Sequence, residues 1–429
     1  MPHYQYTLTT VCQWLLEKLG LPPATAAVFS HPLAGVLGAA ILLFLVILPI
    51  VTYAIWWLRR LLGWMQSRLG PNRVGPAGLL QTPADALKLL TKEDIIPALA
   101  DRWVFTLSPG IVFVSAFLVY VTLPFGPALV VKDLNVGVVY IAAITSLTVI
   151  GIMLAAWSSN NKYALIAAFR SAGQMVSYEV PLALALLGPV MLAQSLSLKG
   201  LVAAQISGGW FVLIQPIMFL GYFCAALAEN NVTPFDIVEA ESEIVAGFHI
   251  EYSGMKFALF FLAEFANTFT VACLSTLLFL GGWHNPLSLI PGVSALGQAA
   301  LDRLPAPFLR DLAAQLWPAA IFFAKAFFLV SVVFWLRATL PRVRIDQLMG
   351  FGWKVLIPLT LANLLVTGLF VAFGWSPLAL AGVNWVILLA CLALGAARRR
   401  VPPPTRTRVP GTPALRAPGT ASTPVEGSL

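Results

Sequence analysis

The sequence contains 429 residues, of which 59% are hydrophobic and only 10% are charged, and its formal net charge is +8. Soluble domains carry about 25% charged residues, so this composition excludes an ordinary soluble protein and predicts a polytopic membrane protein. The cysteines Cys12, Cys224, Cys273 and Cys391 form no Cys-x-x-Cys pair, and the four histidines are scattered. This is not the pattern of a zinc site, an iron–sulfur cluster, a disulfide framework or a bound haem, so we expect no cofactor in this chain.

Residues 1–32 lack the basic start and apolar core of a signal peptide, and we expect them to be extracytoplasmic. Nine apolar runs follow, each near the ~20 residues that span the hydrocarbon core. Their approximate limits are 33–58, 105–124, 136–157, 175–195, 209–228, 255–281, 317–336, 355–373 and 378–397. Only helices satisfy their backbone inside lipid without a free edge. We therefore predict an all-α fold, a polytopic helical membrane protein with about nine transmembrane helices over 33–397, followed by a disordered, basic, Pro-rich tail over 398–429.

The distribution of positive charge predicts the orientation of these helices. With the N-terminus outside and the C-terminus cytoplasmic, nineteen lysines and arginines fall in inside segments and five in outside segments. Lys256 and Lys325 fall within helices. The net positive charge is therefore explained by the topology of a multi-pass protein in the cell inner (plasma) membrane, and it gives no support to nucleic-acid binding.

The first predicted cytoplasmic loop contains "LLQTPADALKLLTKE" at 79–93, in which apolar and polar residues alternate at helical period. This pattern predicts an amphipathic helix in the headgroup plane. Such a helix is either an ordinary surface element or one side of a lateral opening for a lipid-like substrate.

The segment "AENNVTPFDIVEAESEIVAGFHIEY", 228–252, breaks the positive-inside pattern, because it holds six carboxylates and no lysine or arginine. "TPFD" reads as a helix start with Thr233 as the cap, which places Asp236, Glu239 and Glu243 on one face. Crowded carboxylates raise one another's pKa and share protons. The alternative is a solvated surface loop, but interleaved apolar residues such as Phe235 and Phe248 argue against it.

Further acids are expected at bilayer depth, where charges are costly and mark ion pathways. Glu229 ends the fifth predicted helix, Glu264 lies well inside the sixth, and Glu179 opens an apolar run. The alternative is neutralisation of an acid by a structural partner such as Lys325 or Lys256.

Four segments together resemble one known family. They are "RLGPNRVGPAGLLQ…ADALKLLTKEDIIP", "RSAGQMVSYEVPLAL", "AENNVTPFDIVEAESEIVAGFHIEYSGMKFALFFLAEFANTF" and "WLRATLPRVRIDQLMGFGWKVLIPLTLANLL". In this order they are similar to the H subunit of respiratory complex I, the proton-translocating NADH:quinone oxidoreductase, over about 40–370. The resemblance implies eight core helices, with 378–397 as an extra helix. It also implies quinone as the substrate, other complex I subunits as partners, and NADH, FMN and iron–sulfur sites on those partners.

The resemblance further implies roles for individual residues. Arg59 and Arg68 would flank the quinone entrance, Phe261 would face it, and Arg337 and Arg342 would line the charged midsection near Asp346 and Gln347. A proton route would join the quinone chamber to the pumping subunits. Its members would be Glu179, Glu229, Asp236, Glu239, Glu241, Glu243, Glu251, Tyr252 and Glu264.

Two departures from the family pattern leave alternatives open. Leu58 stands where the family usually has an acid, and Val232 stands where it has a base. A membrane anchor of a related hydrogenase or non-NADH dehydrogenase complex is one alternative. A stand-alone proton or cation transporter is another, although no internal repeat of the transporter kind is visible.

Overall fold

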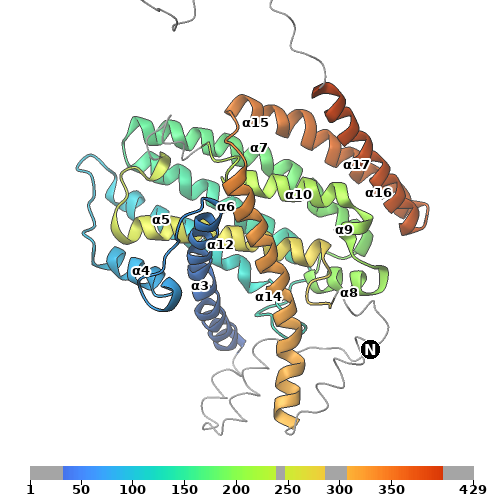
Figure 1. Cartoon of the computed structure of the whole chain (residues 1–429), viewed down its shortest axis with the longest axis horizontal. Helices are drawn as coiled ribbons and strands as arrows, with labels where there is room; N and C mark the ends of the chain where they lie inside the picture. The colour runs from blue at the N-terminus through green and yellow to red at the C-terminus, as the bar shows by residue number, and fades with distance from the viewer. Residues whose placement is uncertain (1–31, 238–246, 286–306, 400–429) are drawn as a thin grey trace, which may run out of the picture. The chain divides into compact units, whose positions relative to one another are not determined.

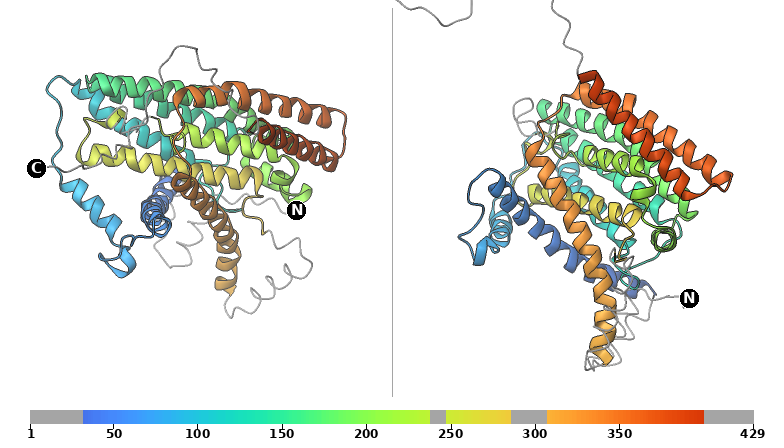
Figure 2. Two further views of the ribbon diagram at one scale, coloured as in Figure 1. Left: turned by 45° about the horizontal axis from the view of Figure 1, so that its top comes forward. Right: turned by 45° about the vertical axis from the view of Figure 1, so that its right-hand side comes forward.

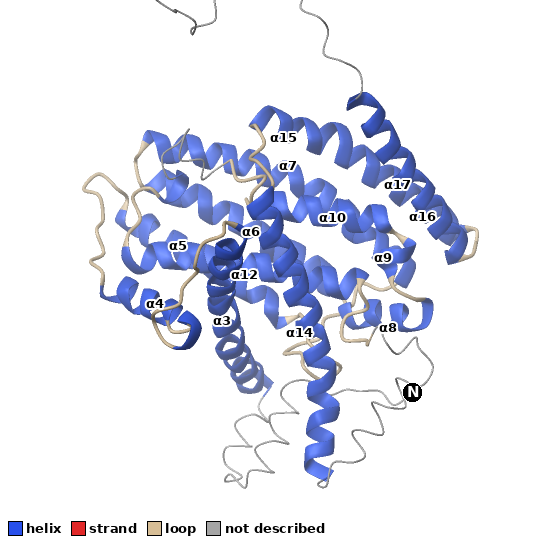
Figure 3. Cartoon of the chain, in the orientation of Figure 1, coloured by secondary structure: helices blue, strands red, loops and turns tan. Residues whose placement is uncertain are grey.

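The structure, a computed structural model, describes residues 32–237, 247–285 and 307–399. Every regular element within these ranges is a helix (Figure 3). The chain forms one compact unit up to Trp385, and the residues from Val386 onward belong to a second unit. The predicted all-α fold is therefore confirmed for the part of the chain that the structure describes.

Seven of the described helical stretches are long and apolar enough to cross a membrane. They lie in α3 (Pro32–Met65), α5 (Arg102–Leu118) with η2 (Val119–Val121), α6 (Gly137–Ser158), α7 (Lys162–Ala193), α12 (Gly254–Phe279), α14 (Pro307–Thr339), and the continuous series α15 (Ile345–Phe351), η5 (Gly352–Leu356) and α16 (Ile357–Ala372). Two shorter apolar helices lie in α10 (Pro216–Glu229) and α17 (Pro377–Arg399). The nine predicted runs thus coincide with helices, and the chain is a multi-pass membrane protein.

One predicted span, 209–228, is not a single helix. Helix α9 (Phe211–Ile214) ends before α10 begins at Pro216, and Gln215 between them has φ −128° and ψ 62°. A proline ring disfavours the helical conformation of the residue before it, which accounts for the break. The short helix α8 (Leu198–Gly208) precedes this pair.

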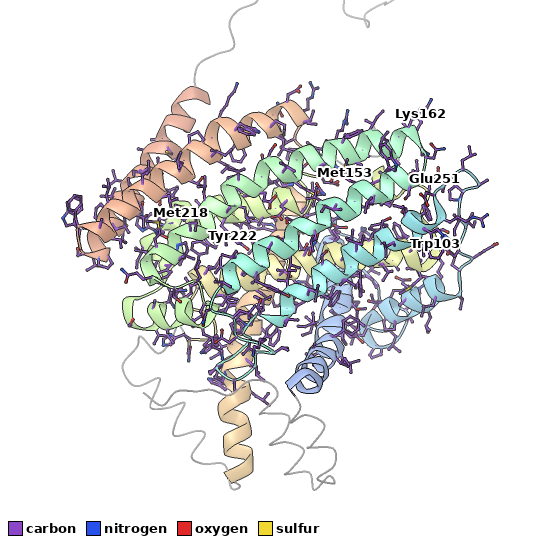
Figure 4. The ribbon with its side chains drawn as sticks, turned by 180° about the vertical axis from the view of Figure 1, so that it is seen from behind. Trp103, Met153, Lys162, Met218, Tyr222 and Glu251 are labelled. Atoms are coloured by element: carbon purple, nitrogen blue, oxygen red, sulfur yellow. The ribbon has the colours of Figure 1, made fainter. Side chains whose placement is uncertain are left out.

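Helix α7 begins earlier than the run at 175–195 predicts. The side chain of Asn161 caps it by accepting a hydrogen bond from the Tyr163 N–H at 2.9 Å, so the first polar turn joins the apolar part in one helix. Helix α5 begins similarly, with the Asp101 carboxylate accepting from the N–H of Trp103. Lys162 and Trp103, which lie in the first turns of these two helices, stand at the same end of the bundle (Figure 4).

The unit up to Trp385 has a simple arrangement. Helices α5, α6, α7, α10 and α12 run side by side, and α16 packs along α7 (Figures 1 and 2). Helices α3 and α14 cross this group at a steep angle, and both contact α12. The cavities described below lie among the helices that run side by side.

Small side chains allow these helices to approach closely, as in membrane helix pairs generally. On α7, Ala164, Ala167 and Ala168 are fully buried. A Cβ atom built on Gly151 of α6 would lie 2.4 Å from a methyl carbon of Val112 on α5, so any larger residue there would force Val112 to shift. The α5–α6 contact therefore depends on that glycine.

The start of α17 is held to the bundle by buried amides. Asn384 donates a hydrogen bond to the Ile214 carbonyl at 2.8 Å and accepts one from Asn363 Nδ2 of α16 at 2.7 Å. Both asparagines are buried, and the Trp385 indole donates to the Leu213 carbonyl at 3.0 Å. Three helices are thus joined by polar contacts within an apolar surrounding.

The predicted amphipathic helix is present as α4 (Gln81–Thr91). It contacts α3 and α12, whereas Leu87 and Leu90 remain exposed. This is the pattern of a helix that presents apolar side chains outward, as an interfacial helix does.

Candidate functional site

A cavity of about 120 Å³ lies inside the bundle, bounded by α5, α6, α7, α10, α12 and the short helix η3 (Gly247–His249). Three expected site residues line it: Glu229 at the end of α10, and Phe261 and Glu264 on α12. The other polar lining side chains are His249, Asn230, Asn231, Asn267 and Thr148. The cavity is therefore a polar chamber within apolar helices and has room for several water molecules.

A second, smaller cavity of about 30 Å³ adjoins the first, because Glu229, Asn230 and Asn267 line both. It extends along α10 toward Tyr222. The side-chain oxygens of Asn231 and Asn267 are buried and have no hydrogen-bond partner among the described protein atoms. Buried polar atoms are normally paired with protein or with ordered water, so these two oxygens suit a hydrated chamber.

The carboxylate of Glu264 is held by an arginine of α14. Arg337 Nη1 lies 3.1 Å from Glu264 Oε1, and the two side chains are only 24% and 19% exposed. A charge-assisted hydrogen bond between partly buried groups is stronger than one between solvated groups. Glu264 thus lies between the cavity on one side and a base expected in the quinone chamber on the other.

Asp236 has a similar arrangement. Its carboxylate is 4% exposed and lies 2.9 Å from Nη2 of Arg342, and the Val343 N–H donates to the Pro234 carbonyl at 3.0 Å. The segment after α10 is therefore bound to the segment after α14. Two arginines expected near quinone, five residues apart, contact two acids expected in the proton route.

The expectation of a helix starting at "TPFD" is wrong for the described residues, because residues 233–237 form a turn followed by irregular backbone. The Asp236 carboxylate accepts a hydrogen bond from Arg342, which ties this segment to the loop after α14. Glu239, Glu241 and Glu243 lie outside the described residues. Beside them, Ile237 and Phe248 are buried, which does not fit a fully solvated loop.

Neither lysine proposed as an alternative partner pairs with Glu264. Lys325 donates to the carbonyls of Leu280, Gly282 and His284 at 2.7, 2.9 and 2.7 Å. Lys256 lies 2.9 Å from the half-exposed Asp94. The bases that reach the acids instead come from the end of α14 and the loop after it.

Glu251 and Tyr252 lie at one end of the parallel helices. Asn161 Nδ2 donates to Glu251 Oε1 at 2.7 Å, and Glu251 stands near the end marked by Lys162 and Trp103 (Figure 4). The ring of Tyr252 stacks on Phe105 with centroids 4.0 Å apart, and its hydroxyl donates to the Phe105 carbonyl at 3.2 Å. Burial raises the pKa of Tyr252, so its hydroxyl stays protonated at neutral pH.

The other residues expected on the quinone side, at the entrance and near the charged midsection, are dispersed. Arg59 of α3 forms an ion pair with Asp85 of α4, and Arg68 Nε donates to Gln66 Oε1 at 2.6 Å. Asp346 and Gln347, in the first turn of α15, are exposed and line neither cavity described above. Phe261 faces the internal cavity.

Sequence reasoning missed several cavity residues. Asn267 follows Glu264 by three positions, so helical spacing already places both on one face. His249 stands six residues before the predicted helix at 255–281, and nothing in the sequence around it marked it as a cavity residue. Glu179 lines neither of the two adjoining cavities, although its charge acts on Glu229.

Comparisons with known proteins show the family to which the chain belongs. The sequence model of the NADH dehydrogenase family matches residues 38–368. An H subunit of NADH-quinone oxidoreductase from Dehalococcoides mccartyi is 47% identical over 356 residues, which are 82% of this chain and 92% of the relative. The corresponding H subunit from Anoxybacillus flavithermus is 51% identical over 329 residues, which are 76% of this chain and 91% of that one. The family match includes the residues that line the cavity and both arginine–carboxylate pairs, and the chain therefore belongs to the NADH dehydrogenase family, among the H subunits of NADH-quinone oxidoreductase.

Proposed function

We propose that this chain is the membrane subunit of a complex I-type enzyme that forms the quinone chamber and the carboxylate route coupling quinone reduction to proton translocation. The single observation that carries the proposal is the double contact of Arg337 with Glu264 and of Arg342 with Asp236. Groups proposed to sense quinone and groups proposed to carry protons thus form common ion pairs.

The two arginine–carboxylate pairs supply a physical link between quinone reduction and proton translocation. Reduction of a quinone to a quinol adds two electrons and two protons, and the electrons come from iron–sulfur clusters on partner subunits, which also hold FMN and the NADH site. A unit charge that develops about 8 Å from a carboxylate, at an effective dielectric constant of about 20, changes its energy by about 2 kcal/mol. A change of that size moves a pKa by more than one unit, which is enough to shift protons along the acids.

The proton route then runs through the hydrated cavity. Glu264 takes up or releases a proton as its contact with Arg337 weakens or tightens, and Glu229 stands on the other side of the same chamber. Glu179 continues the route along α7, while Asp236, Glu239, Glu241, Glu243, Glu251 and Tyr252 form its other members. Arg59, Arg68, Phe261 and Asp346 belong to the quinone side of the proposal.

We also propose the membrane arrangement that this function needs. The chain lies in the bacterial plasma membrane, with residues 1–32 outside, a bundle over 33–397, and the basic tail 398–429 in the cytoplasm. Its partners are the peripheral-arm subunits that complete the quinone site and the small membrane subunits beside the antiporter-like ones. The extra helix over 378–397 lies beyond the part matched by the family.

The proposal is tested by Glu264→Gln in membranes that contain the whole complex. NADH-driven quinone reduction and proton uptake into inverted vesicles are measured, and native gels report assembly. We expect both activities to fall at least about tenfold in a fully assembled complex, because a glutamine amide cannot take up and release a proton as a carboxylate does.

The matched control is Asp133→Asn, which removes a carboxylate from the ion pair with Lys199, 3.8 Å away and outside the cavity. This variant should keep both activities. If Glu264→Gln behaves like Asp133→Asn, the carboxylate route through the cavity is refuted.

A further inference from the structure

His249 occupies a place in the cavity to which neither composition nor family likeness assigns a role. It ends the short helix η3 and lines the chamber together with Glu229 and Glu264. Helix η3 packs against α6 and α7, so its position is set by two of the long parallel helices.

Aromatic rings hold the imidazole on two sides. The ring of Phe248 lies edge-on at 5.1 Å and that of Phe257 at 5.3 Å from the imidazole centroid. Burial lowers the pKa of His249 to about 4, so the ring is neutral at physiological pH. A neutral imidazole carries one nitrogen that donates a hydrogen bond and one that accepts, and it can therefore pass a proton without holding a charge.

The charged groups around the chamber limit what His249 can exchange protons with. Among the described lining residues, the other ionisable side chains are Glu229 on α10 and Glu264 on α12. Helices α5, α6 and α7 contribute Val112, Thr148, Ile152 and Met175, none of which ionises near neutral pH. The ionisable groups that share the described cavity lining with the imidazole are thus two carboxylates.

His249 is also close in the chain to an acid at the exposed end of the bundle. Glu251 follows it by two residues and accepts a hydrogen bond from Asn161. Asn161, with Asp101 and Lys162, lines an open depression of about 510 Å³ at the ends of α5, α6 and α7. The backbone between them is fixed by the Tyr252 N–H, which donates to the His249 carbonyl at 3.0 Å.

We propose that His249 is a proton-relay residue that passes protons between the exposed end of the bundle at Glu251 and the cavity carboxylates Glu229 and Glu264. The inference rests on the proposed function and adds a member to its route. One ring nitrogen binds an incoming proton while the other releases its own to cavity water or to a carboxylate. The ring ends neutral in the opposite tautomer, and a ring turn or a return transfer restores the first, so no charge accumulates.

The test compares His249→Asn with His284→Asn in the assembled complex. His284 belongs to the loop after α12, where its backbone carbonyl accepts from Lys325, so the control makes the same chemical change outside the cavity. Quinone reduction, proton uptake into inverted vesicles and the solvent deuterium isotope effect are measured. For His249→Asn we expect about a tenfold loss of turnover and a larger isotope effect, because an unassisted proton transfer becomes rate-limiting. His284→Asn should change neither.

A purely structural role would lower the amount of assembled complex without raising the isotope effect per complex, and that result overturns the inference. If His249→Asn does not assemble, His249→Gln, which retains more of the volume, is judged by the same two measurements. The inference is also overturned if either assembled variant shows the turnover and the isotope effect of the parent complex. The Glu264→Gln variant distinguishes failure of the relay from failure of the proposed function. If Glu264→Gln stops turnover while the His249 variants do not, only the relay is refuted. If Glu264→Gln also leaves turnover intact, the proposed function is refuted as well.

Discussion

The ion pair between Asp236 and Arg342 should contribute measurably to the stability of the assembled complex. The two atoms lie 2.9 Å apart, and the exposed fractions are 44% for the arginine side chain and 4% for the aspartate. At an effective dielectric constant of about 20, their attraction is about 6 kcal/mol. Desolvation of the aspartate and solvent around the arginine offset most of this, which leaves an expected coupling energy of about 1–2 kcal/mol.

The coupling is measured with a double-mutant cycle of Asp236→Asn, Arg342→Gln and both together. The complex is extracted in detergent and heated, and the fraction that remains assembled on a native gel is followed with time, which does not require activity. The expected coupling corresponds to a change of about 5–30-fold in the rate of dissociation. Arg342→Gln should be the more harmful single change, because it leaves the buried carboxylate without this arginine, whereas Asp236→Asn leaves a half-exposed guanidinium.

The Lys199–Asp133 pair supplies the control cycle. Its atoms are 3.8 Å apart and its side chains are 21% and 40% exposed, so a coupling near zero to 1 kcal/mol is expected. If the Asp236–Arg342 cycle gives no more than the control cycle, the two segments are not held together by this pair, and the electrostatic link between quinone chamber and route loses its basis.

Three further predictions follow from the described contacts. Tyr252→Phe keeps the stack on Phe105 but loses the hydroxyl bond, so we expect a loss of about 1 kcal/mol in thermal stability of the complex and no rearrangement of the helices. The pKa of His249 is lowered to about 4, below the ordinary value of 6.5, so between these two pH values the unfolded chain binds a proton at this residue and the folded chain does not. Stability from this residue is therefore full above pH 6.5 and falls by about 3 kcal/mol toward pH 4, and thermal melting of His249→Asn against the parent should show a smaller decline over that window. Gly151→Val should prevent assembly, because the added carbon atoms overlap Val112, whereas Gly151→Ala should assemble at a reduced level; native gels of membranes distinguish these outcomes.

The helices could be predicted because length and hydrophobicity alone determine which segments can cross a bilayer. Pro216 directly after Gln215 indicates a break in the helix. A prediction based on the length of an apolar run does not register a single proline inside that run. Asn161 similarly extends α7 by a capping bond that a hydropathy pattern does not register. Local backbone chemistry, rather than burial of apolar surface, accounts for both differences.

The site was predictable in its residue types and less so in its contacts. Glu229 and Glu264 line one cavity, and the partner of Glu264 is Arg337, 73 positions away, whereas the sequence offered Lys256 or Lys325 as the alternative partners of a buried acid. Only the packing of α14 against α12 selects among these bases. Asp346 is exposed. The direction of a side chain in the first turn of a short helix depends on how that helix packs, and the neighbouring residues in the sequence do not determine this packing.

The asparagine pair at the start of α17 has an evolutionary consequence. An amide buried in an apolar helix is costly without a partner, so Asn384 and Asn363 each make the other acceptable. A lineage that gains or loses this terminal helix should therefore change both positions together. Chains that end before the helix should carry an apolar residue where this chain has Asn363, and chains that retain it should keep a hydrogen-bonding pair, which makes the two sites a genetic marker of the ninth helix.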